Sequence, residues 1–254
     1  MNSGDLLATI YTTRQVQDAE GRAYPLHSEI TPDEGALLAS LIKKHGSTRT
    51  LEIGCAYGLS SLYICGAITG DRAASHVIID PYQGSEWHNI GIANLRRASL
   101  SCFELIEEPS ELALPRLLRQ DKKFDFALID GYHTFDQTLV DFYFVDRLLE
   151  PNGVVVLDDV HLPAVRKVAR FIAKLPNYRA VGGARQFRSS PSWGRRAVTG
   201  LLRLFARMLP KSFSDDVFAD GLHYDDLDLG VGHEMVAFMK TGTDQRGTHA
   251  FVQF

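Results

Sequence analysis

The feature that most constrains the fold is a regular alternation of short apolar runs with longer amphipathic segments between residues 31 and 175. Short apolar runs are typical of buried strands, and segments of helical period between them are typical of crossover connections. Such crossovers are right-handed and cover both faces of a sheet. The alternation therefore predicts a doubly wound α/β domain built on a mostly parallel sheet.

The expected helices span residues 31–45, 60–67, 87–99, 111–119, 135–149 and 163–175, and the expected strands span residues 50–53, 76–79, 103–106, 124–129, 153–157, 178–181 and 235–239. The helix at 31–45 has the clearest signals, because Thr31 can cap it, Pro32 suits its first turn and Gly46 can end it. We expect one domain over residues 1–254, with a helical N-terminal cap (1–48) and an insertion or lid (184–231) before the last strand.

Charge is mild overall but uneven along the chain. A net charge of −4 excludes the strong positive field of a nonspecific nucleic-acid binder. Residues 179–211 nevertheless contain eight Lys and Arg and no acid, and the following segment to residue 228 contains six aspartates. An apolar stripe of helical period over 198–208 favours a lid helix packed on the domain, with a membrane-surface helix as the alternative.

The three cysteines, Cys55, Cys65 and Cys102, lie in apolar surroundings and are odd in number. This pattern favours buried thiols in a reducing compartment and a cytoplasmic protein. The first residues show no signal-peptide pattern. The uncharged stretch 53–70 contains four glycines and suits a strand, turn and helix better than a membrane span, so no transmembrane segment is expected.

Two acids mark the ends of the first two strands of the sheet. Glu52 precedes a turn with Gly54 and Gly58, which lacks the further glycines of a dinucleotide fingerprint and disfavours a dehydrogenase. A carboxylate at this turn suits a ligand with a positive charge or an amino group. Asp80 ends the next strand, where it can accept both hydroxyls of a ribose. Together the two acids predict a nucleoside ligand with a cationic or amino tail.

Five segments resemble motifs of the class I S-adenosylmethionine-dependent methyltransferases: LEIGCAYGLSS, IIDP, EEPSELALPRL, FDFALIDGYH and LLEPNGVVVLDD. Within that superfamily, the D-G-x-H and D-D patterns resemble the small-molecule O-methyltransferases, both the catechol-type enzymes and the macrolide-sugar and cephalosporin-pathway branch. The resemblance implies a Rossmann-like fold with seven strands, the last one antiparallel. It implies that S-adenosyl-L-methionine contacts Glu52, Gly54, Ala56, Tyr57, Gly58, Ser60, Asp80, Pro81, Ser110, Glu111 and Asp130.

The same resemblance implies a divalent cation, Mg²⁺ or another, held by Asp130, Asp158 and Asp159. Carboxylates are the ligands that such hard cations prefer. The chain differs from the catechol-type pattern at two positions, since Asp159 replaces an asparagine and His133 stands near the place of a catalytic lysine. His133 is therefore the expected general base, with Asp130 beside it as the second catalytic residue.

Other interpretations stay open at this stage. The methyltransferase could work without a metal, with Asp130 and Asp159 only orienting His133, or the chain could be a non-catalytic partner subunit that binds the cofactor. Asp130 could simply form a turn, and the Asp158–Asp159 pair could cap a helix. The expected partner is a hydroxylated small molecule and not a nucleic acid, and a homodimer is left open.

Overall fold

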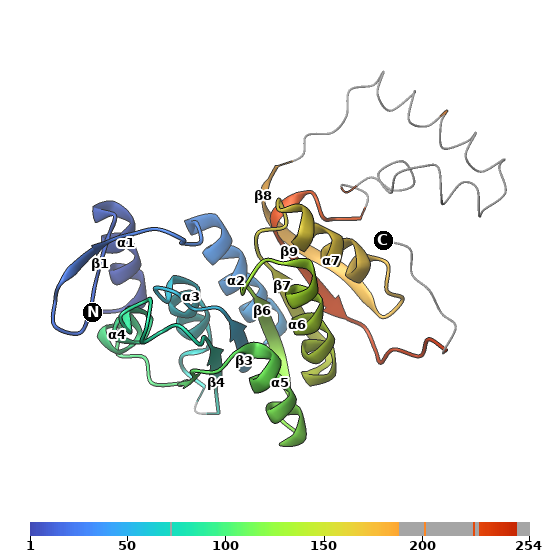
Figure 1. Ribbon diagram of the computed structural model, residues 1–254, viewed down its shortest axis with the longest axis horizontal. Coiled ribbons are helices and arrows are strands. Elements are labelled where there is room, and N and C mark those ends of the chain that lie inside the picture. The colour runs from blue at the N-terminus through green and yellow to red at the C-terminus, as the bar shows by residue number, and fades with distance from the viewer. Residues whose placement is uncertain (72, 188–200, 202–225, 227–228, 248–254) are drawn as a thin grey trace.

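The computed structural model describes residues 1–71, 73–187 and 229–247, together with Leu201 and Asp226 (Figure 1). Its centre is a seven-stranded sheet in the order β5-β4-β3-β6-β7-β9-β8. The strands are β3 (Arg49–Ile53), β4 (Ser75–Ile79), β5 (Phe103–Ile106), β6 (Phe124–Ile129), β7 (Leu149–Leu157), β8 (Tyr178–Gln186) and β9 (His233–Lys240).

The direction of the strands confirms the predicted topology. Strands β5, β4, β3, β6 and β7 pair in parallel, whereas β9 runs antiparallel to both of its neighbours, β7 and β8. The order reverses at β3, from which the chain moves first to β4 and β5 and later to β6 and β7. In doubly wound sheets ligands bind beyond the carboxyl ends of the strands at this switch point.

Helices cover both faces of the sheet (Figure 1). One apolar core joins the sheet to α1 (Ser3–Thr13), α2 (Pro32–His45), α3 (Leu59–Ile68) and α4 (Ile90–Arg97). A second core joins the opposite face to α5 (Ser110–Arg119), α6 (Phe135–Leu148) and α7 (Pro163–Ala173). Leu51 and Ile53 of β3 belong to the second core, so the residues that alternate with them, Thr50 and Glu52, face the first.

Local signals explain why several predicted bounds are accurate. Thr31 and Glu34 form a capping box at the start of α2, and Gly46 ends the helix in the left-handed conformation at φ 65°. The helix expected from residue 87 begins only at Ile90, because His88 and Asn89 both have positive φ and cannot continue a right-handed helix.

Two expectations need correction. The N-terminal cap is not purely helical, since β1 (Gln15–Gln17) and β2 (Ala23–Pro25) form a small antiparallel sheet within it. Strand β8 continues past the predicted end at 181, and its pairing with β9 extends to Gln186. The predicted insertion boundary at 184 therefore falls inside this strand. The rest of the insertion, including the helix expected over 198–208, lies almost wholly outside the described residues.

Within the described part of the chain, no helix has the length and apolar character needed to cross a lipid bilayer.

Candidate active site

The turn after β3 brings backbone from two neighbouring strands into close contact. Gly54 has a φ of 86°, and a Cβ on it would lie 1.9 Å from the carbonyl oxygen of Asp130, which directly follows β6. Gly58 precedes the first residue of α3 with a φ of 76°, and a Cβ there would lie 2.9 Å from the α-carbon of Gly91. Only glycine fits at either position.

Asp80 ties the end of β4 to this glycine turn. Its buried carboxylate accepts hydrogen bonds from the backbone N–H groups of Cys55 and Ala56, both at 3.0 Å, and from the side-chain amide of Gln83 at 2.9 Å. Its other oxygen accepts from the N–H of Tyr82. The carboxylate therefore fixes the conformation of the turn from a neighbouring strand.

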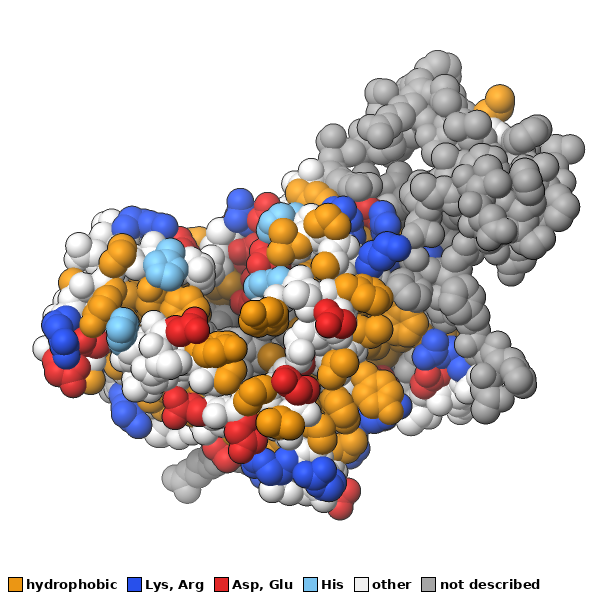
Figure 2. Space-filling model, viewed as in Figure 1, with side chains coloured by type: hydrophobic (Ala, Val, Ile, Leu, Met, Phe, Trp, Pro, Cys, Tyr) orange, Lys and Arg blue, Asp and Glu red, His pale blue; other side chains and the backbone are white. Residues whose placement is uncertain are grey.

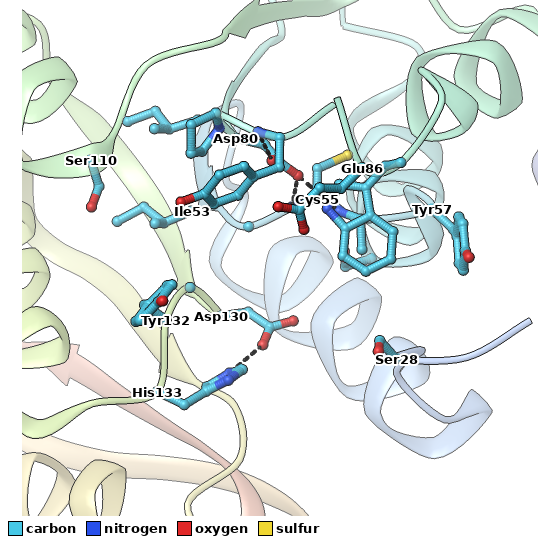
Figure 3. Close-up of a pocket in the computed structure, with 18 of the residues that line it drawn as sticks. Ser28, Ile53, Cys55, Tyr57, Asp80, Glu86, Ser110, Asp130, Tyr132 and His133 are labelled. Carbon is cyan, nitrogen blue, oxygen red and sulfur yellow. Dashed lines mark hydrogen bonds and ion pairs between the residues drawn. The ribbon is translucent and has the colours of Figure 1, made fainter. Parts of the chain in front are cut away.

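A cavity of about 550 Å³ opens beyond the carboxyl ends of β3, β4 and β6. Its walls are the glycine turn, the segment after β4, the first residues of α5, the loop 130–133 and the N-terminal segment 28–30. Figure 3 shows Asp80 and Asp130 on facing walls, with Tyr57 and Ser28 toward one end. In the space-filling view, acidic and histidine side chains lie along the edge of a hollow on this face (Figure 2). The volume falls within the range of small-molecule sites.

Asp130, His133 and Asp159 converge at the cavity wall. The Nε2 atom of His133 lies 3.1 Å from Oδ1 of Asp130 and 3.3 Å from Oδ2 of Asp159. His133 and Asp159 both have positive φ, at 55° and 53°, a backbone conformation that such residues seldom adopt outside turns and functional sites. In the described part of the chain, these three side chains are the group whose ligand atoms lie close enough to share a metal ion.

Burial and proximity shift the pKa values of these groups. Burial raises the pKa of Asp130 to about 6, against the opposing effect of its hydrogen bond with His133. That same hydrogen bond raises the pKa of His133. Burial also raises the pKa of Asp158 well above its usual range, and the nearby charge of Asp130 adds to the effect. An opposing positive charge would therefore relieve repulsion between these carboxylates.

Comparisons with known proteins agree with this geometry. The model of a family described as a methyltransferase domain matches residues 51–160, which run from β3 to just beyond β7. A protein of Mycobacterium avium (strain 104), named "Putative O-methyltransferase", is 29% identical over 163 residues, which are 57% of this chain and 69% of that protein.

Two solved structures share the fold. The O-methyltransferase TomG from Streptomyces achromogenes, in complex with S-adenosylmethionine, aligns with a TM-score of 0.53 and 22% identity over 60% of this chain and 73% of its own. An O-methyltransferase from Bacillus cereus, in complex with S-adenosylhomocysteine, aligns with a TM-score of 0.55 and 20% identity over 70% of this chain and 81% of its own.

Residues 51–160 thus match a methyltransferase domain, and the chain is similar in sequence and in fold to S-adenosylmethionine-dependent O-methyltransferases.

The structure places most of the predicted cofactor residues around one cavity. The residues that line it are Gly54, Ala56, Tyr57, Ser60, Asp80, Pro81, Ser110, Glu111 and Asp130. Gly58 does not line the cavity. Its left-handed backbone conformation joins the turn to the first residue of α3. Of the predicted metal ligands, Asp130 and Asp159 meet at His133, whereas Asp158 is not part of this cluster and accepts the backbone N–H of Asp159 at 2.9 Å.

Glu52, the residue before Ile53 of the cavity wall, does not line the cavity itself. Its carboxylate is fully buried, lies 3.0 Å from Nε2 of His76 and accepts a hydrogen bond from the hydroxyl of Ser61. The other ring nitrogen of His76 contacts the hydroxyl of Thr50 at 2.9 Å. The strand period already places Glu52 opposite Leu51 and Ile53, but only the packing of α3 on that face shows what the carboxylate contacts.

Two further groups beside the cavity were not assigned by sequence reasoning. The amide of Gln137 on α6 donates to the hydroxyl of Ser110 at 2.9 Å and to Glu111 at 3.2 Å. On the opposite wall, His27 lies 2.8 Å from the hydroxyl of Tyr57, and the ring of Tyr57 packs edge-on against Trp87. Gln137, His27 and Trp87 lie outside the five motifs, so no local signal distinguishes them from ordinary packing.

Proposed function

We propose that this enzyme methylates a hydroxyl group of a small molecule, with His133 as the general base. The observation that carries the proposal is the position of His133, whose imidazole lies between two carboxylates on the wall of the cavity that also contains the glycine turn. A loop after β6 and a loop after β7 supply the two carboxylates, so the imidazole is held from both sides.

The residues around the cavity fit S-adenosylmethionine. Gly54 lets the backbone approach without a side chain, Ser60 lies at the start of α3, and Ser110 and Glu111 form a polar wall on the other side of Asp80. We assign these residues, with Ala56, Tyr57 and Pro81, to the cofactor. The bound sulfonium supplies an electrophilic methyl group, and a nucleophile opposite it must lose a proton as it attacks.

His133 is suited to take that proton. With Nε2 protonated and donating to Asp130, Nδ1 is the ring nitrogen that accepts a proton. The two carboxylates stabilise the imidazolium that forms, and they fix which tautomer is present beforehand. Proton transfer to a positioned group of this kind contributes roughly 10²–10⁴-fold to a rate.

A divalent cation fits the same cluster. Carboxylate oxygens from Asp130 and Asp159 and a nitrogen of His133 come from different loops and converge, which suits Mg²⁺, Mn²⁺ or another divalent ion. Such an ion would lower the pKa of the acceptor hydroxyl. In the metal-independent alternative, Asp130 and Asp159 act only on His133, a role that their contacts with the imidazole also support.

Isothermal calorimetry with Mn²⁺ on the metal-stripped protein separates these two possibilities. Stoichiometric binding that is lost in Asp159→Ala supports the metal. No binding to the native chain, together with methyl transfer that persists in EDTA, supports His133 acting without a metal.

The reaction itself is tested with S-adenosylmethionine that carries a labelled methyl group and a panel of phenols, sugars and aliphatic alcohols. We expect label in a methyl ether for at least one acceptor, and loss of label transfer in His133→Gln. Transfer only to amines or carbon atoms, in a protein that binds S-adenosylhomocysteine, would contradict the proposed acceptor.

A further inference from the structure

Helix α6 carries apolar side chains on the face that it turns to solvent. Val140 is 37% exposed and Tyr143 is 50% exposed, and they lie between two exposed charged residues, Asp136 and Arg147. The buried face of the same helix includes the polar side chain of Asp141. A surface helix of a monomer normally places its apolar residues inward and its polar residues outward. The outward face of α6 is therefore typical of a helix that packs against a further element.

The apolar surface extends to both sides of these residues. Leu139 and Phe144 of α6 are half-buried, and Leu112 of α5, the helix that packs against α6, is 61% exposed. Figure 2 shows hydrophobic side chains gathered over α5 and α6 on this face of the molecule. Single exposed apolar residues are common on proteins, whereas a contiguous group of them marks an interaction surface. This face of the protein therefore suits a protein partner.

The outward residues of α6 follow the spacing of a helix–helix contact. Asp136, Val140, Tyr143 and Arg147, which we call the α6 stripe, are separated by four, three and four residues. This is the a/d spacing of coiled coils, in which one side of a helix packs along a second helix. From Asp136 to Arg147 the α6 stripe runs roughly 16 Å along the helix axis. A second helix that lies along α6 is therefore the kind of element that fits this face.

The α6 stripe is complementary to a second copy of itself in antiparallel orientation. A two-fold axis that passes α6 between residues 141 and 142, at the middle of the helix, relates position 136 to 147 and position 140 to 143. Asp136 then meets Arg147 of the partner subunit, and Val140 meets Tyr143 of the partner subunit. Each contact occurs twice, because the same surface is used on both copies.

Charge favours the antiparallel orientation over the parallel one. Asp136 lies in the first turn of α6 and Arg147 in the last, so an antiparallel pair places opposite charges together, whereas a parallel pair places like charges together. The two helix dipoles also interact favourably when the helices are antiparallel. The guanidinium of Arg147 is held on this face, because it lies 3.5 Å from the centre of the Tyr143 ring and donates to the carbonyl oxygen of Tyr143 at 2.7 Å.

We propose that the outward face of α6 is a dimer interface, in which α6 packs antiparallel against α6 of a second copy of this chain. The α6 stripe forms the centre of the interface, and the apolar side chains of Leu139, Phe144 and Leu112 extend it. The interface lies beside the active-site cavity and not within it, because the amide of Gln137, the residue after Asp136, donates to Ser110 on the cavity wall.

Charge reversal tests the proposal on the full chain. In Asp136→Arg and in Arg147→Asp, both ion pairs of the dimer become like-charge contacts. We expect each variant alone to associate about tenfold or more weakly than the wild type in sedimentation velocity over a range of concentrations. An equimolar mixture of the two variants restores opposite charges at both contacts, so native mass spectrometry should detect the mixed dimer in excess of either homodimer. Both substitutions oppose the helix dipole in the mixture as well, so restored association reports the contact itself.

Two further variants complete the test. Lys44→Asp reverses a charge in the last turn of α2, which packs on the opposite face of the sheet, and should leave association unchanged. Val140→Asp places a charge in the middle of the α6 stripe and should give a monomer with the wild-type circular dichroism spectrum, because residue 140 is exposed in a single copy. A wild type that is monomeric at every concentration, whether alone or bound to phospholipid vesicles, would overturn the proposal. A dimer that neither charge reversal weakens would overturn it as well.

Discussion

The α-carbon of Gly54 lies against the backbone of Asp130, so that a Cβ atom on residue 54 would stand 1.9 Å from the carbonyl oxygen of Asp130. These two residues directly follow the adjacent strands β3 and β6. The contact therefore brings the proposed cofactor turn and the proposed catalytic loop together. A substitution of Gly54 is therefore expected to disturb both the turn and the loop.

Gly54→Ala is expected to destabilise the fold and to abolish cofactor binding. The left-handed conformation costs an alanine about 1–2 kcal/mol, and the contact with Asp130 adds a displacement of rigid backbone. Gly21→Ala is the matched control, because Gly21 has a similar φ of 83° but open space where the Cβ would lie. Thermal unfolding and calorimetry with S-adenosylhomocysteine should show a small loss of stability and unchanged affinity for the control. Equal effects in the two variants would mean that the close approach at Gly54 has no consequence.

Asp80→Asn is expected to weaken binding of S-adenosylhomocysteine by about 10–100-fold. The single oxygen of the asparagine amide cannot replace both carboxylate oxygens, one of which accepts from the N–H groups of Cys55 and Ala56 and the other from the N–H of Tyr82. One unsatisfied buried group costs about 1–3 kcal/mol. Asp18→Asn is the control, since Asp18 is also buried and accepts backbone N–H groups, from Glu20 and Arg22, outside the cavity. It should lower the unfolding temperature while leaving the affinity as it is. An affinity loss in Asp18→Asn equal to that in Asp80→Asn would point to general destabilisation instead.

His133→Gln is expected to lower kcat by about 10²–10⁴-fold with little change in the KM for S-adenosylmethionine. The imidazole contacts Asp130 and Asp159 and makes no hydrogen bond with the glycine turn. His161→Gln provides the comparison, because His161 reaches the same Asp159 at 3.5 Å with a side chain that is 44% exposed. Its removal should change kcat by less than about threefold, as is usual for exposed ion pairs. If His133→Gln instead raises KM alone, His133 positions the cofactor and is not the base.

Asp141→Asn is expected to gain stability relative to the wild type as the pH rises from about 4 to about 6. Burial raises the pKa of Asp141 to about 6 from 3.8, so in this window the folded state binds more protons than the unfolded state. The stability of the wild type therefore falls with rising pH, by up to about 3 kcal/mol, and a neutral asparagine does not pay this cost. Urea unfolding at a series of pH values measures the difference.

Asp136, on the same helix, gives a control of opposite sign. It is exposed, and a hydrogen bond from Thr134 lowers its pKa. Its stabilising contribution is present above the pKa of the unfolded chain and is lost as the pH falls. Asp136→Asn should therefore be less stable than the wild type near neutral pH and similar to it in acid. The same pH trend in both variants would contradict the assigned environment of Asp141.

The sequence by itself determined the fold class, the strand that each motif follows, and most of the bounds of the helices and strands. Alternation of apolar runs and helical periods depends on local geometry, so it is readable without the fold. Asp80 after β4 and the glycines after β3 could be placed close together, because the carboxyl ends of parallel strands lie at the same end of the sheet. The resemblance to methyltransferase motifs then indicated S-adenosylmethionine as the expected ligand.

Only the tertiary structure decided what individual polar groups contact. Asp158 and Asp159 both follow the end of β7, and Asp159 has a positive φ of 53°, so no strand period could show that Asp159 reaches His133. In the same way, Glu52 was expected at the ligand, but its carboxylate contacts Ser61 of α3 and His76 of the neighbouring strand β4. Contacts of this kind join segments that are far apart in the chain. They depend on how the helices pack on the sheet, which no local sequence pattern predicts.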